Sequence, residues 1–159
     1  RESTDDSGEV DFPLVSRIDG ADPADVVRRG EIGARLREAL DAFETAVAAG
    51  QDSAGPDYRF HLEIARATGN DRFAELMTTL GITMIPRVRL GHGDVAAVRG
   101  NVQMQRDYLL RVNAEHEWIY DAIAACDPET ARSAMRTHLA RSRERRRQAD
   151  AGSTRRKRA

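Results

Sequence analysis

The feature that most restricts the fold is the spacing of apolar residues, which recur every three or four positions along much of the chain. The clearest series consists of Ile32, Leu36, Leu40, Phe43 and Val47. This spacing places one apolar stripe along a helix. The β-branched residues do not cluster in alternating runs, and helix-favouring Ala, Leu, Arg and Glu dominate the composition. The sequence therefore predicts an all-α protein without a sheet.

Start and stop signals divide this pattern into about six to seven helices, joined by short connections as in an antiparallel bundle. Asp127-Pro128 is typical of a helix start, with Asp as the cap and Pro at the first helical position. Gly69 suits the left-handed residue that follows many helices. Gly30 and Asn113 are candidate breaks inside two of the longer helical patterns.

Charge is distributed unevenly along the 159 residues. Residues 141–159 carry a net charge of +7, whereas the whole chain carries −1, so the other 140 residues sum to −8. An acidic body does not suit a domain that grips nucleic acid through its main surface. We interpret residues 1–21 as an acidic linker, 22–145 as a helical ligand-binding domain and 146–159 as a basic, disordered tail. Contact between the tail and DNA, RNA or acidic protein remains a weaker alternative.

The single cysteine, Cys126, excludes an internal disulfide framework and suits a reducing compartment. The sequence shows no signal-peptide pattern at its start. None of its apolar runs approaches the roughly 20 residues that a membrane span requires. We therefore expect a cytoplasmic protein that does not enter a membrane.

Three of the four histidines, His61, His116 and His138, each lie on the apolar stripe of a separate predicted helix. Asp57 precedes the first of them by four residues, which places both side chains on one helical face. His92 lies between two glycines in a predicted loop and is set aside. A buried polar group without a partner costs about 1–3 kcal/mol. We therefore expect the three histidines and Asp57 to gather at one satisfied site.

The pattern alone leaves three interpretations of that site open: a metal centre, a hydrogen-bonded structural cluster and a catalytic acid–base site. Three imidazoles and a carboxylate suit Zn²⁺, Ni²⁺, Mn²⁺ or Fe²⁺, with open positions for water or an oxygen ligand. A metal-dependent, hydrolase-like enzyme is therefore an alternative function. Against it, the nearest carboxylates in sequence, Glu63 and Glu115, point away from their neighbouring histidines by helical angle.

Two longer motifs surround these residues. The first is Asp57-x-x-Phe60-His61 followed by Ile64-Ala65-x-Ala67-Thr68-Gly69-Asn70, and the second runs from Glu115-His116-x-x-Ile119 through Asp127-Pro128-x-x-Ala131 to Met135-x-x-His138-Leu139. Together they resemble the FCD domain, the C-terminal effector-binding domain of FadR-type GntR transcription regulators. The resemblance covers roughly residues 23–145. In its metal-binding branch, an Asp and a His from one helix and two later His hold a divalent metal inside an all-α bundle. The matching positions are Asp57, His61, His116 and His138.

The resemblance also implies a small carboxylate effector that completes the coordination sphere, with an Arg at its far end. Arg87 and Arg89 lie in the region where that Arg is expected, and an arginine fork matches a carboxylate bidentately. It further implies a homodimer that reaches DNA through an N-terminal winged helix, which residues 1–21 are too short and too acidic to supply. We therefore expect a sensing domain of a bacterial transcription regulator, and not an enzyme.

Overall fold

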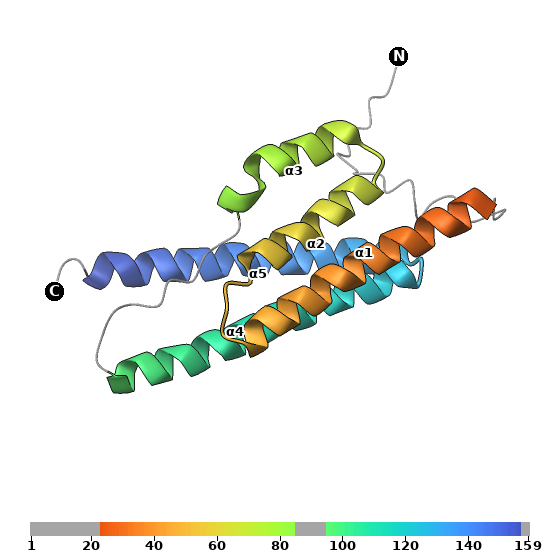
Figure 1. The fold of residues 1–159 in the computed structure, drawn as a ribbon. Coiled ribbons are helices and arrows are strands. Elements are labelled where there is room, and N and C mark those ends of the chain that lie inside the picture. The colour runs from red at the N-terminus through yellow and green to blue at the C-terminus, as the bar shows by residue number, and fades with distance from the viewer. Residues whose placement is uncertain (1–22, 85–94, 157–159) are drawn as a thin grey trace, which may run out of the picture.

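The computed structural model describes residues 23–84 and 95–156, and within these ranges it contains five α-helices and no strand (Figure 1). They are α1 (Pro23–Ala48), α2 (Ala54–Ala67), α3 (Asp71–Met84), α4 (Val95–Ala124) and α5 (Pro128–Arg156). The all-α prediction is confirmed, and the helix count in this part of the chain is lower than the predicted six to seven. Gly30 and Asn113 lie inside the continuous helices α1 and α4. Tertiary packing overrides the modest helix propensity cost of such residues.

The local signals at the helix ends act as expected. Gly69, directly after the C-cap of α2, has a φ of +69°, in the left-handed region that glycine adopts without a steric penalty. Asn70 caps α3, since its Oδ1 accepts a hydrogen bond of 3.1 Å from the backbone N–H of Phe73. Asp127 caps α5 in the same way through the N–H of Thr130, at 3.0 Å. Side chains therefore satisfy backbone donors at both helix starts.

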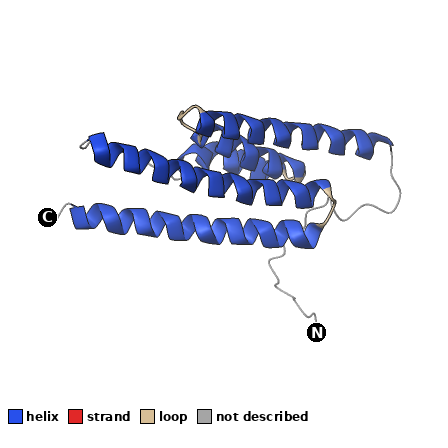
Figure 2. Ribbon diagram, turned by 90° about the horizontal axis from the view of Figure 1, so that it is seen from below, coloured by secondary structure: helices blue, strands red, loops and turns tan. Residues whose placement is uncertain are grey.

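Helix α1 is the centre of the packing, because it lies against both α2 and α4. Helix α5 packs on α4, and α3 packs on α2 (Figures 1 and 2). The main core cluster draws residues from α1, α2, α4 and α5, namely Ile32, Leu36, Ala39, Leu40, Phe60, Ile64, Ile119 and Ala134. A smaller cluster of Phe43, Val47 and Val112 continues the α1–α4 contact. Burial of these stripes is the main force that holds the helices together.

Helices α2 and α5 face each other without packing directly. In the described residues, no Cα atom of α2 lies within 8 Å of a Cα atom of α5, although both helices contribute to the main core. The rings of His61 and His138 meet across this gap, with centroids 5.1 Å apart. The candidate site therefore lies where two helices are connected by side chains and not by backbone contact.

Helix α5 extends to Arg156, so helix continues well into the segment 146–159 for which the sequence predicts a disordered tail. The proposed domain boundaries themselves stay predictions. Among the described helices, none combines the length and apolar character that would let it cross a membrane.

Candidate metal centre

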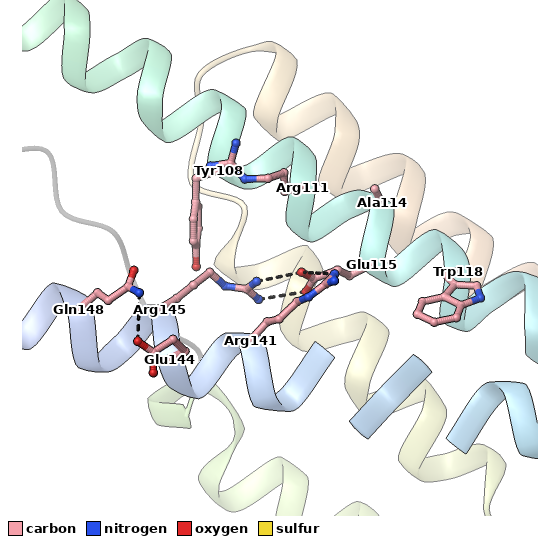
Figure 3. A pocket seen from close by; sticks show the side chains of 9 residues that line it. All are labelled: Tyr108, Arg111, Ala114, Glu115, Trp118, Arg141, Glu144, Arg145 and Gln148. Atoms are coloured by element: carbon pink, nitrogen blue, oxygen red, sulfur yellow. Dashed lines mark hydrogen bonds and ion pairs between the residues drawn. The ribbon is translucent and has the colours of Figure 1, made fainter. Parts of the chain in front are cut away.

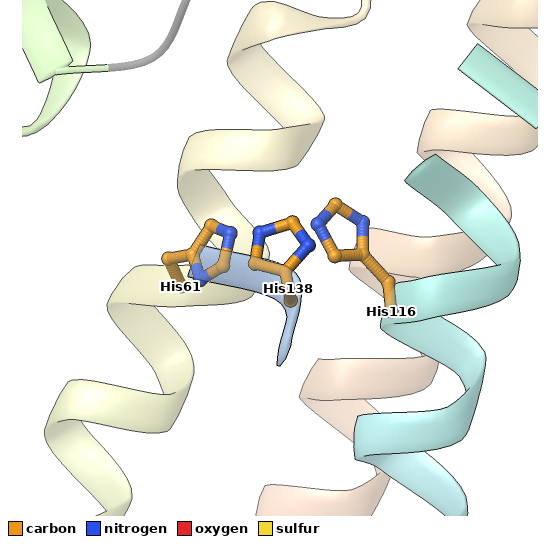
Figure 4. Close-up of side chains that lie close together, drawn as sticks. All are labelled: His61, His116 and His138. Atoms are coloured by element: carbon orange, nitrogen blue, oxygen red, sulfur yellow. The ribbon is translucent and has the colours of Figure 1, made fainter. Parts of the chain in front are cut away.

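Three helices bring the predicted ligands together, as Figure 4 shows for the histidines. His61 comes from α2, His116 from α4 and His138 from α5. One ring nitrogen from each lies within 4.8 Å of the other two. The structure therefore gathers histidines that are 22 to 77 positions apart in sequence, as their shared place on the apolar stripes predicts.

Asp57 completes the group from one turn before His61 on α2. Its Oδ1 atom lies 3.3 Å from Nε2 of His61 and 3.4 Å from Nε2 of His116. This oxygen is buried and has no hydrogen-bond partner. Both ring nitrogens of His116 are also buried and without a partner. A satisfied structural cluster would pair these atoms, because unpaired buried polar groups are costly. The donor set instead fits a cation that takes an electron pair from each ligand.

The surroundings keep the central histidine neutral. His116 is fully buried, and the rings of Phe43 and Phe60 lie 5.5 and 4.8 Å from its ring centre. Burial, together with the nearby His61, His138 and Arg145, holds the pKa of His116 well below its usual range. Only the neutral imidazole has a lone pair available for a metal. The surroundings of His116 thus favour the neutral imidazole that metal coordination requires.

His138 is held from its other side by Glu115. The Nδ1 atom of His138 lies 2.9 Å from Oε2 of this glutamate. Burial alone would raise the pKa of Glu115, but hydrogen bonds from Arg145 and His138 outweigh it and lower the pKa. Burial and the neighbouring His61 lower the pKa of His138, and Glu115 offsets part of this effect. An ionised Glu115 accepts a hydrogen bond from the Nδ1–H of His138, which leaves the Nε2 lone pair of His138 for the cluster.

The role of Glu115 corrects the sequence analysis, which found no acid or base beside the histidines. Helical angle does turn this carboxylate away from its neighbour His116, but it turns it toward His138 of the adjacent helix. Glu63 does face elsewhere, and its oxygens pair with Arg35 and Arg66. Both oxygens of Glu115 are engaged, so it is not free to act as a general base. This arrangement weakens the hydrolase alternative.

Arg145 is a second residue that the sequence analysis missed. Its two terminal nitrogens donate to the Glu115 carboxylate at 2.9 and 3.1 Å, in the bidentate arrangement that arginine favours. A spacing of seven from His138, two helical turns, is the signal that places both on one face of α5. Three other residues of the sequence analysis lie outside the described residues, namely Arg87, Arg89 and His92.

Comparison with protein-family models matches residues 27–141 to the FCD domain. This span contains both motifs and all four candidate ligands. A search among curated proteins found no match. The family match, over most of the chain, agrees with the helical bundle and with the gathered histidines. The chain therefore belongs to the FCD family, the regulatory effector-binding domains of GntR-type transcription regulators.

Proposed function

We propose that this chain is a metal-dependent sensing domain for a small organic acid in a bacterial GntR/FadR-type regulator. The observation that carries the proposal is the buried Oδ1 of Asp57, which lies between two histidine nitrogens without a hydrogen-bond partner. Membership of the FCD family supports the regulatory role. In this proposal the chain reaches DNA through a winged helix outside the sequence given.

Asp57, His61, His116 and His138 would hold the metal. Imidazole and carboxylate ligands suit Zn²⁺, Ni²⁺, Mn²⁺ or Fe²⁺, and availability decides among them as much as affinity. The ion would supply a Lewis acid with positions open to a carboxylate oxygen. Arg87 and Arg89 remain the proposed contacts for the far end of the effector. The protein would contribute by keeping the three histidine ligands neutral and the aspartate ligand ionised. It would also keep water away from them.

The gap between α2 and α5 suggests how binding is transmitted. The four ligands come from α2, α4 and α5, and no Cα atoms of α2 and α5 approach within 8 Å of each other in the described residues. A bound ion would therefore tie together two helices whose backbones are not in contact. An effector shifts the helix arrangement only to the extent that it binds one arrangement more tightly than another. In a homodimer, this shift would change the relative placement of the two DNA-binding heads.

The test is metal analysis of the purified protein together with thermal melts in the presence and absence of chelator. The expected result is about one divalent ion per chain and a lower melting temperature in chelator, since a ligand bound to the native state stabilises it. His116→Ala should lose the ion, and His92→Ala, which removes the histidine that the sequence sets apart from the predicted ligands, should keep it. Asp57→Asn provides a milder variant in case the alanine variant does not fold.

Protein without a metal, with melts indifferent to chelator and to added Zn²⁺ or Ni²⁺, would overturn the metal site. If metal binds, isothermal titration with small carboxylates such as acetate, lactate and citrate then tests the effector class. Affinity for a carboxylate that disappears with the metal supports sensing through the metal centre.

A further inference from the structure

A groove of about 620 Å³ runs between α4 and α5, and Glu115 is among the residues that line it (Figure 3). Its α4 wall carries Arg111, Ala114 and Trp118, at the spacing of one helical face. Its α5 wall carries Arg141 and Arg145. Glu115 belongs to the groove and also hydrogen-bonds His138, so one carboxylate is shared by the groove and the histidine cluster.

Two arginines of the groove are not fully paired with the acidic side chains that line it. Arg111 is exposed and forms no hydrogen bond or ion pair with any described residue. Arg141 has a side chain that is 59% exposed, and it makes a single contact of 3.4 Å with Glu115. The other acid in the wall, Glu144, accepts a hydrogen bond from Gln148 instead. Two guanidinium groups can therefore face an added anion.

An aromatic surface lies at the end of the same wall. Trp118, the only tryptophan of the chain, is 45% exposed. It follows Arg111 by seven residues, a rise of roughly 10 Å along the helix. Ala114, which lies between them in the same wall, has a small side chain that leaves room in the groove. Large aromatic side chains are normally more covered than this, and an exposed indole that lines the same groove as arginines suits a planar, negatively charged ligand.

We propose that the α4/α5 groove is a second binding site, for a small aromatic carboxylate whose ring lies on Trp118 and whose carboxylate meets Arg111 and Arg141. We further propose that Glu115 couples this site to the histidine cluster. Binding in the groove stands independently of the proposed metal site, whereas the coupling rests on it.

The direction of the coupling follows from charge. A carboxylate on Arg141 draws this cation away from Glu115 and adds negative charge near the cluster. Both changes favour a cation at the histidines and strengthen Glu115 as the acceptor for the Nδ1 proton of His138. A ligand bound in the groove should therefore increase the affinity of the histidine cluster for the metal. The bound metal should increase the affinity of the groove for its ligand by the same factor, which we expect to be about fivefold.

The first experiment titrates the metal-free full chain with benzoate at constant ionic strength, using the fluorescence of Trp118. Saturable change at millimolar benzoate is expected, while benzamide, which has the same ring without the charge, should bind at least tenfold more weakly. Equal effects of benzoate and benzamide, or no saturable change, would overturn the groove site. Acetate tests the ring contribution and should also bind more weakly than benzoate.

Charge-removing variants then locate the site. Arg111→Gln and Arg141→Gln should each weaken benzoate binding about fivefold or more, because each removes one guanidinium. Arg143→Gln is the matched control, since it removes an exposed arginine of α5 that does not line the groove. Equal affinity in all three variants and the unmodified protein would place the anion elsewhere and overturn the proposal.

The coupling is measured by titrating Zn²⁺ calorimetrically with and without saturating benzoate. A tighter metal affinity with benzoate supports it if both Glu115→Gln and Arg141→Gln abolish the gain, because glutamine at 115 still accepts from His138 without carrying charge. Direct coordination of benzoate to the metal would survive Arg141→Gln. Unchanged metal affinity would overturn the coupling. If no metal binds but benzoate still does, the proposed metal-dependent function fails while the groove site survives, so the two failures are distinguishable.

Discussion

The Nδ1 atom of His138 lies 2.9 Å from Oε2 of Glu115, and this contact joins α5 to α4 beside the histidine cluster. The same carboxylate accepts hydrogen bonds from both terminal nitrogens of Arg145. The glutamate side chain is only 8% exposed, so its charge depends on these partners. A single buried residue thus fixes the orientation of one candidate ligand and the position of the arginine-rich part of α5.

Removing this carboxylate should destabilise the metal-free protein. Glu115→Ala leaves Arg145 with an uncompensated charge, and breaking a buried ion pair costs about 3–5 kcal/mol. We expect a loss near the lower end, because the Arg145 side chain is 19% exposed. Urea denaturation in chelator measures the change. Glu115→Gln should lose less, and the exposed Glu144→Gln should lose little; equal stability of Glu115→Ala and the unmodified protein would contradict the prediction.

The metal-free protein should lose stability as the pH falls below about 6.5. Burial lowers the pKa of His116 and of His138 from the 6.5 of an unfolded chain. Below that pH the unfolded state binds protons that the native state excludes, so the free energy of unfolding decreases on acidification. Above it, both states are neutral and the contribution is fully present. Urea denaturation from pH 8 to pH 5 in chelator follows this change.

A variant of His116 provides the control for the pH dependence. His116→Gln removes one of the two histidines whose pKa is lowered, so its stability should change less between pH 8 and pH 5. His92→Ala should keep the full dependence. A slope that is the same in all three proteins would show that the buried histidine does not resist protonation.

Asp57→Asn should act in opposite directions on stability and on metal binding. At pH 8 in chelator, the variant should be as stable as the unmodified protein or more stable, by at most about 1 kcal/mol, because it removes a buried charged oxygen that lacks a hydrogen-bond partner. With Zn²⁺ present it should be less stabilised, since one ligand is lost. Asp41→Asn, at an exposed position of α1, serves as the control. A large loss of stability in chelator would instead favour a structural role for Asp57.

Two glycine substitutions should change the stability of the bundle in opposite directions. A Cβ at Gly81 of α3 would clash with the ring of Tyr58 on α2, so Gly81→Ala should destabilise the bundle by about 1–3 kcal/mol through overpacking. A Cβ at Gly30 of α1 meets no atom within 4 Å, so Gly30→Ala should stabilise by about 0.5–1 kcal/mol through helix propensity. Thermal melts of both variants check the pair. Gly81→Ala with unchanged stability would mean that the Tyr58 ring moves aside freely.

Local structure was readable from the residues themselves. The apolar spacing identified the helices, and Asp127 and Gly69 marked ends that the structure confirms. The three candidate histidines were named from their place on apolar stripes, and Asp57 was named from its spacing of four from His61. These features depend on residues within one or two helical turns of each other, where the period of the helix fixes which side chains share a face. Breaks proposed at Gly30 and Asn113 were wrong, because long-range packing outweighs the propensity of one residue.

Only the tertiary structure decided which side chains from different helices meet. The contact of Glu115 with His138, the unpartnered nitrogens of His116 and the groove beside Trp118 all depend on the rotation and separation of α4 and α5. The gap between α2 and α5 likewise follows from how both helices pack on the rest of the core. Periodicity states that a residue faces inward, but the partner it finds there is set by how whole helices cross and rotate against each other.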